Sequence, residues 1–123
     1  IQVFVLEQSV PEDEELDEYD STAIHAIAVV GEEVIGTARL LIHNSTCGQI
    51  GRMAVGKSWR RQSIGGQILL YLEKEASSRG ITQVMLHAQE YIKTFYSGHG
   101  YIEHGDPFLE AGILHIEMLK DIK

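Results

Sequence analysis

The stretch RRQSIGGQILLYLEKEA (residues 60–76) contains the longest helical pattern in the 123-residue chain. Its apolar residues recur at helical spacing, at Ile64, Ile68, Leu69, Leu72 and Ala76. The pattern predicts an amphipathic helix from Ser63 to Arg79, with Gly80 in the position that favours a left-handed C-terminal cap. Gly65 and Gly66 fall in the first turn, where no Cβ blocks an approaching group.

Short apolar segments flank this helix on both sides. Before it, strands are expected at 22–30, 34–42 and 49–55, the first two joined by a turn at 31–33. After it, strands are expected at 82–88, 101–105 and 113–120, with a short helix at 91–99. Residues 1–8 are ambiguous between a helix end and a strand. The order predicts one α/β (α+β) domain over 1–123, with a mixed sheet that begins antiparallel, has a parallel centre and is flanked by helices.

Composition and charge exclude several classes of function. The formal net charge is −8 at pH 7, whereas nucleic-acid binding needs a basic face. No apolar run approaches the ~20 residues of a membrane span, and no segment resembles a signal peptide. We therefore expect a cytoplasmic protein that binds neither nucleic acid nor membrane. Cys47 is the only cysteine, which excludes an internal disulfide, and the six histidines lack metal-ligand spacing, so no metal is inferred.

The segment GRMAVGKS (51–58) fits the nucleotide-binding pattern G-x-x-x-x-G-K-[ST] letter for letter. The residues between its glycines are typical of a strand that continues from Ile50. A helix beginning at Lys57 would carry Gly65 and Gly66 in its interior, at ~1 kcal/mol each. The strand at 82–88 ends without the aspartate that holds Mg²⁺ in such enzymes. We therefore interpret the match as accidental.

The polar loop before the long helix is the better candidate for an anion site. It contains Lys57, Arg60 and Arg61, and it follows a strand that ends near Val55. The first amides of a helix are unpaired, and the helix dipole adds partial positive charge there. The glycine pair has a second explanation, because it could serve only to let neighbouring elements pack closely. Spacing alone leaves both explanations open.

These residues resemble a known motif. The pattern R-x-x-G-x-G/A at the start of a helix is the acyl-CoA pyrophosphate loop of the GNAT N-acetyltransferase superfamily, and residues 60–76 are similar to it. Ser63 stands at the first glycine position, and we expect it to cap the helix. QIGRMAV (49–55) resembles the family's bulged fourth strand. HAQEYIKTFYSGHGY (87–101) resembles its downstream signature, with Gln89, Ile92 and Tyr96 at the asparagine, alanine and tyrosine positions.

Two further segments resemble a small bacterial branch of this superfamily, the ElaA/YjcF-like acetyltransferases. VFVLEQSVPEDEELDEYD (3–20) is similar to the opening V-F-V-x-E-Q-x-x-P of that branch. FLEAGILHIEMLK (108–120) is similar to its closing D/E-x-G-I-P-H-I-x-M, with Leu114 in place of proline. The resemblance implies that the family's first strand and most of its first helix are absent from this sequence, and that residues 1–8 are the end of that helix.

The resemblance also implies a cofactor and its site. It predicts acetyl-CoA as co-substrate, no metal, and direct transfer of the acetyl group to a primary amine. The backbone around Met53 and Val55 is expected to pair with the pantetheine arm, and an amide near Val55 to polarise the thioester carbonyl. The expected cofactor-binding residues are Met53, Ala54, Val55, Arg60, Arg61, Gln62, Ser63, Ile64, Gly65, Gly66, Gln89 and Tyr96.

Acetyl transfer needs an acid for the leaving thiolate and a base for the amine. A thiol titrates near ~8.5 and tyrosine near ~10, so Tyr96 is expected to donate the proton. An alkylamine near ~10.4 is mostly protonated at neutral pH, and Glu7 is the first candidate for its base, with His115 second. Each has a structural alternative: Tyr96 and His115 as core residues, and Glu7 as a loop contact. Cys47 is not expected to act as nucleophile, because direct attack needs no acyl-enzyme.

The sequence does not identify the amine that accepts the acetyl group. A polyamine, an amino sugar, a drug-like amine and a protein N-terminus all fit, and the segments 9–20 and 105–112 are expected to be loops that line its pocket. The oligomeric state is also open, with a homodimer as one option. Ser63, Gln89 and Leu114 depart from the family pattern. A non-catalytic acyl-CoA-binding module is therefore the alternative function.

Overall fold

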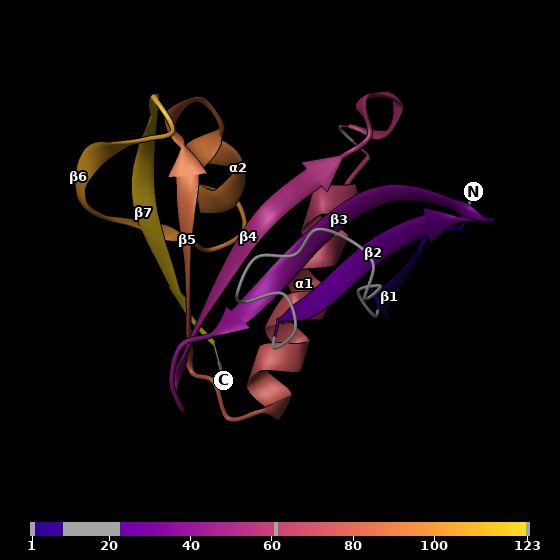
Figure 1. Ribbon diagram of the computed structural model, residues 1–123, viewed down its shortest axis with the longest axis horizontal. Helices are drawn as coiled ribbons and strands as arrows, with labels where there is room; N and C mark the ends of the chain where they lie inside the picture. Colours follow the sequence, from indigo (N-terminus) through magenta and orange to yellow (C-terminus); the bar gives the residue numbers. More distant parts are fainter. Residues whose placement is uncertain (1, 9–22, 61, 123) are drawn as a thin grey trace.

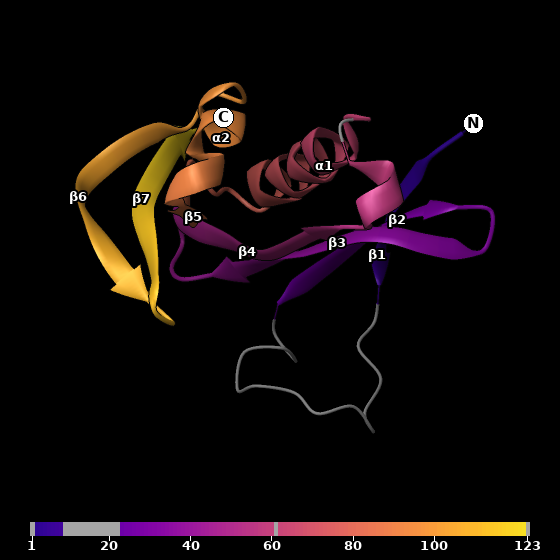
Figure 2. The same ribbon diagram turned by 90° about the horizontal axis from the view of Figure 1, so that it is seen from above.

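The computed structural model describes residues 2–8, 23–60 and 62–122, and Figure 1 shows them as a sheet with helices packed against it. The strands are β1 (Phe4–Gln8), β2 (Ile24–Val30), β3 (Glu33–Ile42), β4 (Cys47–Val55), β5 (Gln83–Gln89), β6 (Ile102–Glu110) and β7 (Ile113–Asp121). The helices are α1 (Ile64–Ser78) and α2 (Lys93–Ser97), with short 3₁₀ turns at Lys57–Trp59 and Glu90–Ile92. Figure 2 shows α1 and α2 on the same side of the sheet.

The topology of the sheet confirms the predicted fold class. The strand order is β1-β2-β3-β4-β5-β7-β6. Neighbouring strands are antiparallel except for the central pair β4–β5, which is parallel. Residues 51–55 of the apparent nucleotide-binding motif lie within β4, as their strand-like composition predicted.

The prediction that residues 1–8 end a helix is wrong. Residues 4–8 form β1, which pairs with β2 from Phe4 opposite Val29 to Gln8 opposite His25. The edge of β2 offers backbone hydrogen bonds to an added strand, and valine and phenylalanine favour extended backbone. Val5 packs against the core while Phe4 is exposed on the other face. The segment 9–20, and with it the acidic run, lies outside the described residues.

The prediction of a loop over 105–112 is also wrong. Strand β6 continues through Glu110, and only Ala111 and Gly112 form the turn into β7. Between the pairs His104–Glu117 and Phe108–His115 the register shifts, so β6 carries a bulge there. The bulge contains Gly105, at φ 79°, and Pro107, residues that an edge strand accommodates at such an irregularity. Cys47 is the first residue of β4.

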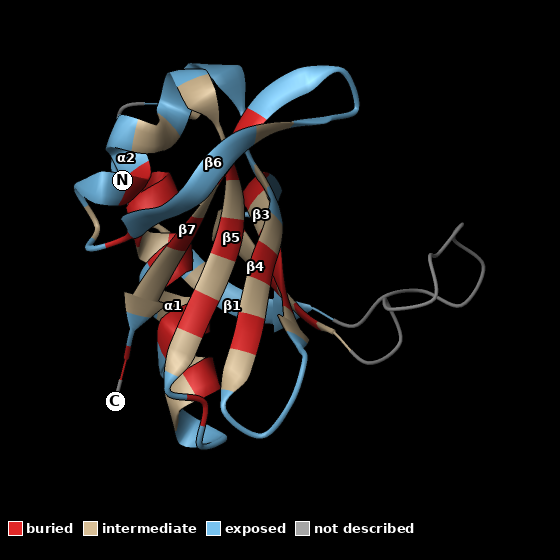
Figure 3. Cartoon of the chain, turned by 90° about the vertical axis from the view of Figure 1, so that its left-hand side faces the viewer, coloured by how far each residue is buried: buried red, intermediate tan, exposed pale blue. Residues whose placement is uncertain are grey.

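The core lies between α1 and the sheet. The predicted apolar positions of the helix, Ile64, Ile68, Leu69, Leu72 and Ala76, are all buried. They pack with alternate residues of the strands, and Figure 3 shows buried and intermediate bands alternating along β5 and the first part of β4. Full burial of a side chain such as Leu72 stabilises the fold by ~1.5–3 kcal/mol. This packing fixes the position of α1 relative to β4.

The central parallel pair separates along its length. Strands β4 and β5 pair only where residues 47–49 lie beside residues 83–85. Beyond Gln49, β4 continues beside β3 alone and β5 beside β7 alone, and Figure 1 shows the two strands diverging. A bulge accompanies the separation, because Thr37 pairs with Ala54 but Arg39 pairs with Gly51, and Arg52 has φ 54°. The sheet therefore opens at its centre.

Candidate active site

Two adjoining cavities occupy the opening between β4 and β5. The sheet cavity, of about 600 Å³, is lined mainly by β4, β5 and the β6–β7 hairpin, including Gln89, Glu110 and His115. The helix cavity, of about 630 Å³, is lined by the start of α1 and by α2, including Ser63, Gly65 and His99. Both cavities are lined by Met53, Val55, Arg60, Ile92 and Tyr96. These shared residues mark where the two spaces meet.

The start of α1 leaves backbone amides available to the helix cavity. The first helical hydrogen bond runs from the Gln67 amide to the Ser63 carbonyl, at 3.0 Å. The amides before Gln67 therefore have no carbonyl partner within the helix. Arg60 lies nearby, and its Nε donates to the Val55 carbonyl at 3.2 Å. Such a set of amides beside a guanidinium suits an anionic group.

Ser63 does not cap α1, contrary to the sequence prediction. Its side chain makes no capping hydrogen bond, and its backbone is left-handed, at φ 64° and ψ 16°. A residue with a Cβ is strained in that conformation, whereas glycine is not. The glycine that the family pattern has at this position is thus explained by backbone conformation.

The glycine pair lets α1 approach the segment that contains α2. A Cβ on Gly65 would lie 3.0 Å from Cζ of Phe95, and a Cβ on Gly66 would lie 2.7 Å from Cε1 of His99. Real Cβ atoms do not come as close as the second distance. A Cβ at position 66 would therefore force the His99 ring or the helix to move. A role of these glycines in holding a ligand stays a prediction.

Tyr96 lies on α2 and is 6% exposed, at the junction of the two cavities. Its ring makes edge contacts with Phe95 and Tyr101, at centroid distances of 5.0 Å and 6.0 Å. Among the described residues its hydroxyl has no hydrogen-bond partner. Burial raises the pKa of this hydroxyl above its ordinary value of 10.0, so it is protonated at neutral pH. A protonated and unpaired hydroxyl can donate a proton to a bound group.

His115 lies on β7 with its ring buried at the wall of the sheet cavity. Its Nδ1 lies 2.7 Å from the carbonyl of Ile113. A carbonyl only accepts, so Nδ1 must carry a proton and donate it. In the neutral ring, Nε2 then has a free lone pair. Nε2 faces Oε1 of Glu110 at 3.7 Å.

The other predicted residues are not all brought to this site. Gln89 lines the sheet cavity, whereas Glu7 lies on β1, at the outer edge of the sheet, and lines neither cavity. Arg61 lies outside the described residues. Among the remaining expected cofactor contacts, Met53, Ala54, Val55, Arg60, Ser63, Ile64 and Gly65 line at least one cavity.

Sequence reasoning missed Glu110 and His87, which both line the sheet cavity. His87 Nδ1 and Glu110 Oε2 are 3.2 Å apart. Glu110 stands at the acidic position of the closing motif that also contains His115, which was the available signal. His87 gave no such signal, because only the pairing of β5 with β7 brings it near that hairpin.

Two structural features are absent from the described residues. These residues contain no helix with both the length and the apolar character needed to span a membrane. Nor do they contain a group of three or more histidine, cysteine, aspartate or glutamate side chains that could hold a metal ion.

The chain is similar to acetyltransferases in both sequence and structure. The family described as Acetyltransferase (GNAT) domain matches residues 1–122. The uncharacterized N-acetyltransferase YjcF of Bacillus subtilis is 39% identical over 121 residues, covering 98% of this chain and 86% of that protein. Escherichia coli ElaA is 27% identical with a TM-score of 0.75, over 86% of this chain and 74% of that one. A GNAT acetyltransferase from Elizabethkingia anophelis, solved with acetyl-CoA bound, has a TM-score of 0.80 at 16% identity, over 98% of both chains.

Proposed function

The chain belongs to the GNAT acetyltransferase family, and on that premise we propose that it transfers an acetyl group from acetyl-CoA directly to a primary amine. The observation that carries the proposal is the position of Tyr96, a largely buried side chain at the junction of two cavities whose hydroxyl has no partner among the described residues. One cavity suits the cofactor and the other the acceptor, so their junction is where the acetyl group would pass between them.

The helix cavity supports acetyl-CoA as co-substrate. The diphosphate would lie at the amides of residues 63–66, beside Arg60, and the pantetheine arm would lie along β4. Beyond Gln49, β4 has no strand partner on the side of β5, so this edge is available for backbone pairing with an amide-bearing arm. The amide near Val55 would polarise the thioester carbonyl. The proposal is supported by the Elizabethkingia protein, which has a similar fold and was solved with acetyl-CoA bound.

Tyr96 and His115 supply the acid and the base in this proposal. Tyr96 protonates the thiolate of coenzyme A as the C–S bond breaks. His115 accepts a proton from the amine at Nε2, because Nδ1 is committed to the Ile113 carbonyl. Of the two bases suggested by the sequence, His115 is favoured because it lines the sheet cavity with Tyr96, whereas Glu7 lies on the outer strand.

Thiol release from acetyl-CoA with a panel of amines tests the proposal. The panel contains polyamines, amino sugars, drug-like amines and peptides with free N-termini. We expect release that depends on an amine, and an acetylated product in the mass spectrum. Thermal shift with acetyl-CoA and with ATP–Mg²⁺ gives the binding control, since only a true ligand raises the melting temperature by mass action. A shift with acetyl-CoA but no turnover with any amine would instead indicate a non-catalytic acyl-CoA-binding module.

A further inference from the structure

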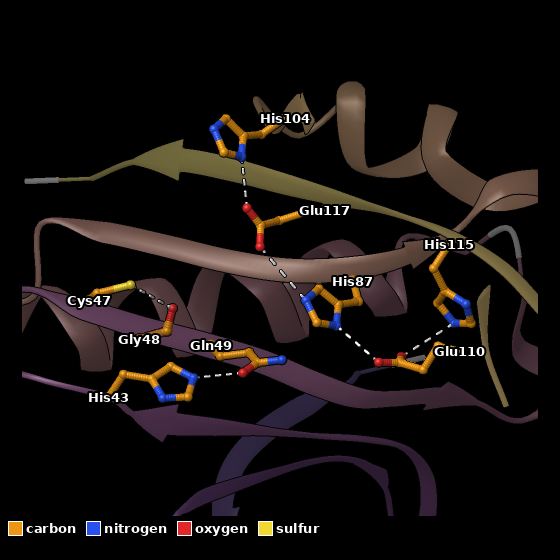
Figure 4. Close-up of polar contacts among 9 residues, drawn as sticks. All are labelled: His43, Cys47, Gly48, Gln49, His87, His104, Glu110, His115 and Glu117. Carbon is orange, nitrogen blue, oxygen red and sulfur yellow. Dashed lines mark hydrogen bonds and ion pairs between the residues drawn. The ribbon is translucent and has the colours of Figure 1, made fainter. Parts of the chain in front are cut away.

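Histidine and glutamate side chains alternate in a row that begins at the sheet cavity. The row ends at the surface formed by the neighbouring strands β5, β7 and β6. The order of the side chains is His115, Glu110, His87, Glu117 and His104, as Figure 4 shows. The successive N–O distances are 3.7, 3.2, 3.8 and 2.8 Å. The side chain of His115 is 9% exposed, that of Glu110 is 49% exposed and that of His104 is 64% exposed. The row therefore connects the interior of the site with solvent.

Strand pairing places these side chains together. His87 on β5 and His104 on β6 both lie opposite Glu117 on β7, so the three project from the same face of the sheet. Phe108 lies opposite His115 and packs against both imidazoles at the cavity end. Its ring contacts that of His87 edge-on at 5.0 Å and stacks on that of His115 at 6.1 Å. This packing holds the two imidazoles on either side of Glu110.

We propose that these five side chains form a proton relay that carries a proton of the acceptor amine from His115 to solvent at His104. The proposal rests on the proposed acetyl transfer and adds a route for the proton that this reaction releases. An ammonium acceptor loses two protons as its nitrogen bonds to the acetyl carbon. One proton ends on the sulfur of coenzyme A, by way of Tyr96, and the other must reach bulk water.

Each step of the relay moves one proton between a nitrogen and an oxygen. Nε2 of His115 accepts from the amine and passes the proton to Oε1 of Glu110. The carboxyl group rotates and donates to Nδ1 of His87, whose Nε2–H then passes to Oε2 of Glu117. Rotation of that carboxyl brings the proton to Nδ1 of His104, and the exposed ring releases a proton from Nε2 to water. Tautomer exchange at His87 and His104 resets the row, and no redox partner is needed.

Two of the four links are longer than a hydrogen bond. The gaps of 3.7 Å and 3.8 Å must each close by roughly 0.5 Å to reach the ~3.2 Å limit of a hydrogen bond. Such links commonly tighten when substrate fills a site. Glu110 and His115 both line the sheet cavity, so an acceptor bound there would contact the two side chains whose separation must shorten.

The test compares Glu117→Gln with Glu103→Gln in the full chain. Glutamine keeps the shape of glutamate but cannot carry the proton. Glu103 is the matched control, because it precedes His104 on β6 but lies on the opposite face of the sheet, where it pairs with Lys93. With an acceptor from the amine panel, we expect Glu117→Gln to lower kcat about 10-fold, less than the ~10²–10⁴-fold that a general acid or base itself supplies. The KM for acetyl-CoA should stay unchanged, and Glu103→Gln should keep the wild-type kcat.

Rescue separates a relay from a structural role. Imidazole added to Glu117→Gln should restore kcat, because a diffusible base can take the proton from His87. His87→Gln should behave in the same way, with unfolding by urea checking that both variants stay folded. Equal kcat for Glu117→Gln and Glu103→Gln, or a loss that imidazole does not restore, would overturn the relay while leaving acetyl transfer intact. Absence of turnover by the wild-type chain with every amine would overturn the proposed function, and the relay with it.

Discussion

At the scale of single residues, Tyr96 is the group on which turnover is expected to depend. Tyr96→Phe removes a buried hydroxyl that burial keeps protonated, so the thiolate would leave without its acid. We expect kcat to fall ~10²-fold, as for loss of a general acid, with the affinity for acetyl-CoA nearly intact. Thiol release and calorimetric titration measure the two quantities. Tyr71→Phe is the control, because Tyr71 lies on α1 and lines neither cavity. Equal losses of turnover and affinity would assign Tyr96 to binding or structure.

Ser63 carries a backbone strain that a single substitution should relieve. Its φ of 64° is disfavoured for a residue with a Cβ, and no side-chain cap compensates for it. Ser63→Gly is therefore expected to raise the free energy of unfolding by ~1 kcal/mol, measured with urea. Ser77→Gly, within α1, is the control and should lower it by ~0.5–1 kcal/mol. If both variants changed the free energy of unfolding in the same direction, the positive φ of Ser63 would not be a source of strain.

At the scale of elements, the contact of α1 with the segment after α2 depends on Gly66. Gly66→Ala places a Cβ within 2.7 Å of the His99 ring, and we expect it to destabilise the protein by ~1–3 kcal/mol. In a His99→Ala background the ring is gone, and alanine should then stabilise the helix by up to ~1 kcal/mol relative to glycine. A double-mutant cycle in urea measures this reversal of sign. An unchanged effect in both backgrounds would show that His99 is not the cause.

The pairing of elements also explains why β1 and the full length of β6 were not predicted from the sequence. The segment 4–8 has no periodicity of its own long enough to distinguish helix from strand, and it becomes β1 because β2 offers a free edge. Gly105 and Pro107 are residues typical of loops. They nevertheless lie in a bulge within β6, because β6 pairs with β7 on both sides of them. By contrast, the apolar spacing of residues 64–76 was enough to predict α1 and its buried face.

At the scale of the whole molecule, a buried polar network links α1 to the far strands. Tyr101 donates to Oε2 of Glu73 at 2.8 Å, and Lys120 Nζ donates to Oε1 at 2.8 Å. Burial, and secondly the Glu73 carboxylate, raise the pKa of the Tyr101 hydroxyl far above its ordinary value. The pKa of Tyr96 is raised by burial as well. Both hydroxyls thus keep their protons in the folded state at pH values where the unfolded chain loses them.

This difference predicts how stability depends on pH. Below pH ~10 the tyrosines are protonated in both states, so their contribution is fully present. As pH rises above ~10, the unfolded chain binds fewer protons than the fold, and the free energy of unfolding falls by up to ~1.4 kcal/mol per pH unit for each tyrosine. Urea unfolding at pH 9 and pH 11 measures the fall. Tyr101→Phe should lower stability at pH 9, by leaving Oε2 of Glu73 without its donor, and should make the fall shallower. An equal fall in the wild-type protein and in Tyr101→Phe would show that the raised pKa of Tyr101 does not cause it.

The sequence alone was sufficient for the central helix, for the mixed sheet and for the resemblance to the family that the comparisons then showed, because these depend on local periodicity and on short ordered motifs. The tertiary structure was needed to show that β4 and β5 separate, that Tyr96 lies between two cavities, and that Glu110 and His87 lie near His115 while Glu7 does not. Those features depend on register and crossover between strands distant in the chain. No local pattern of residues encodes the distance between two such strands.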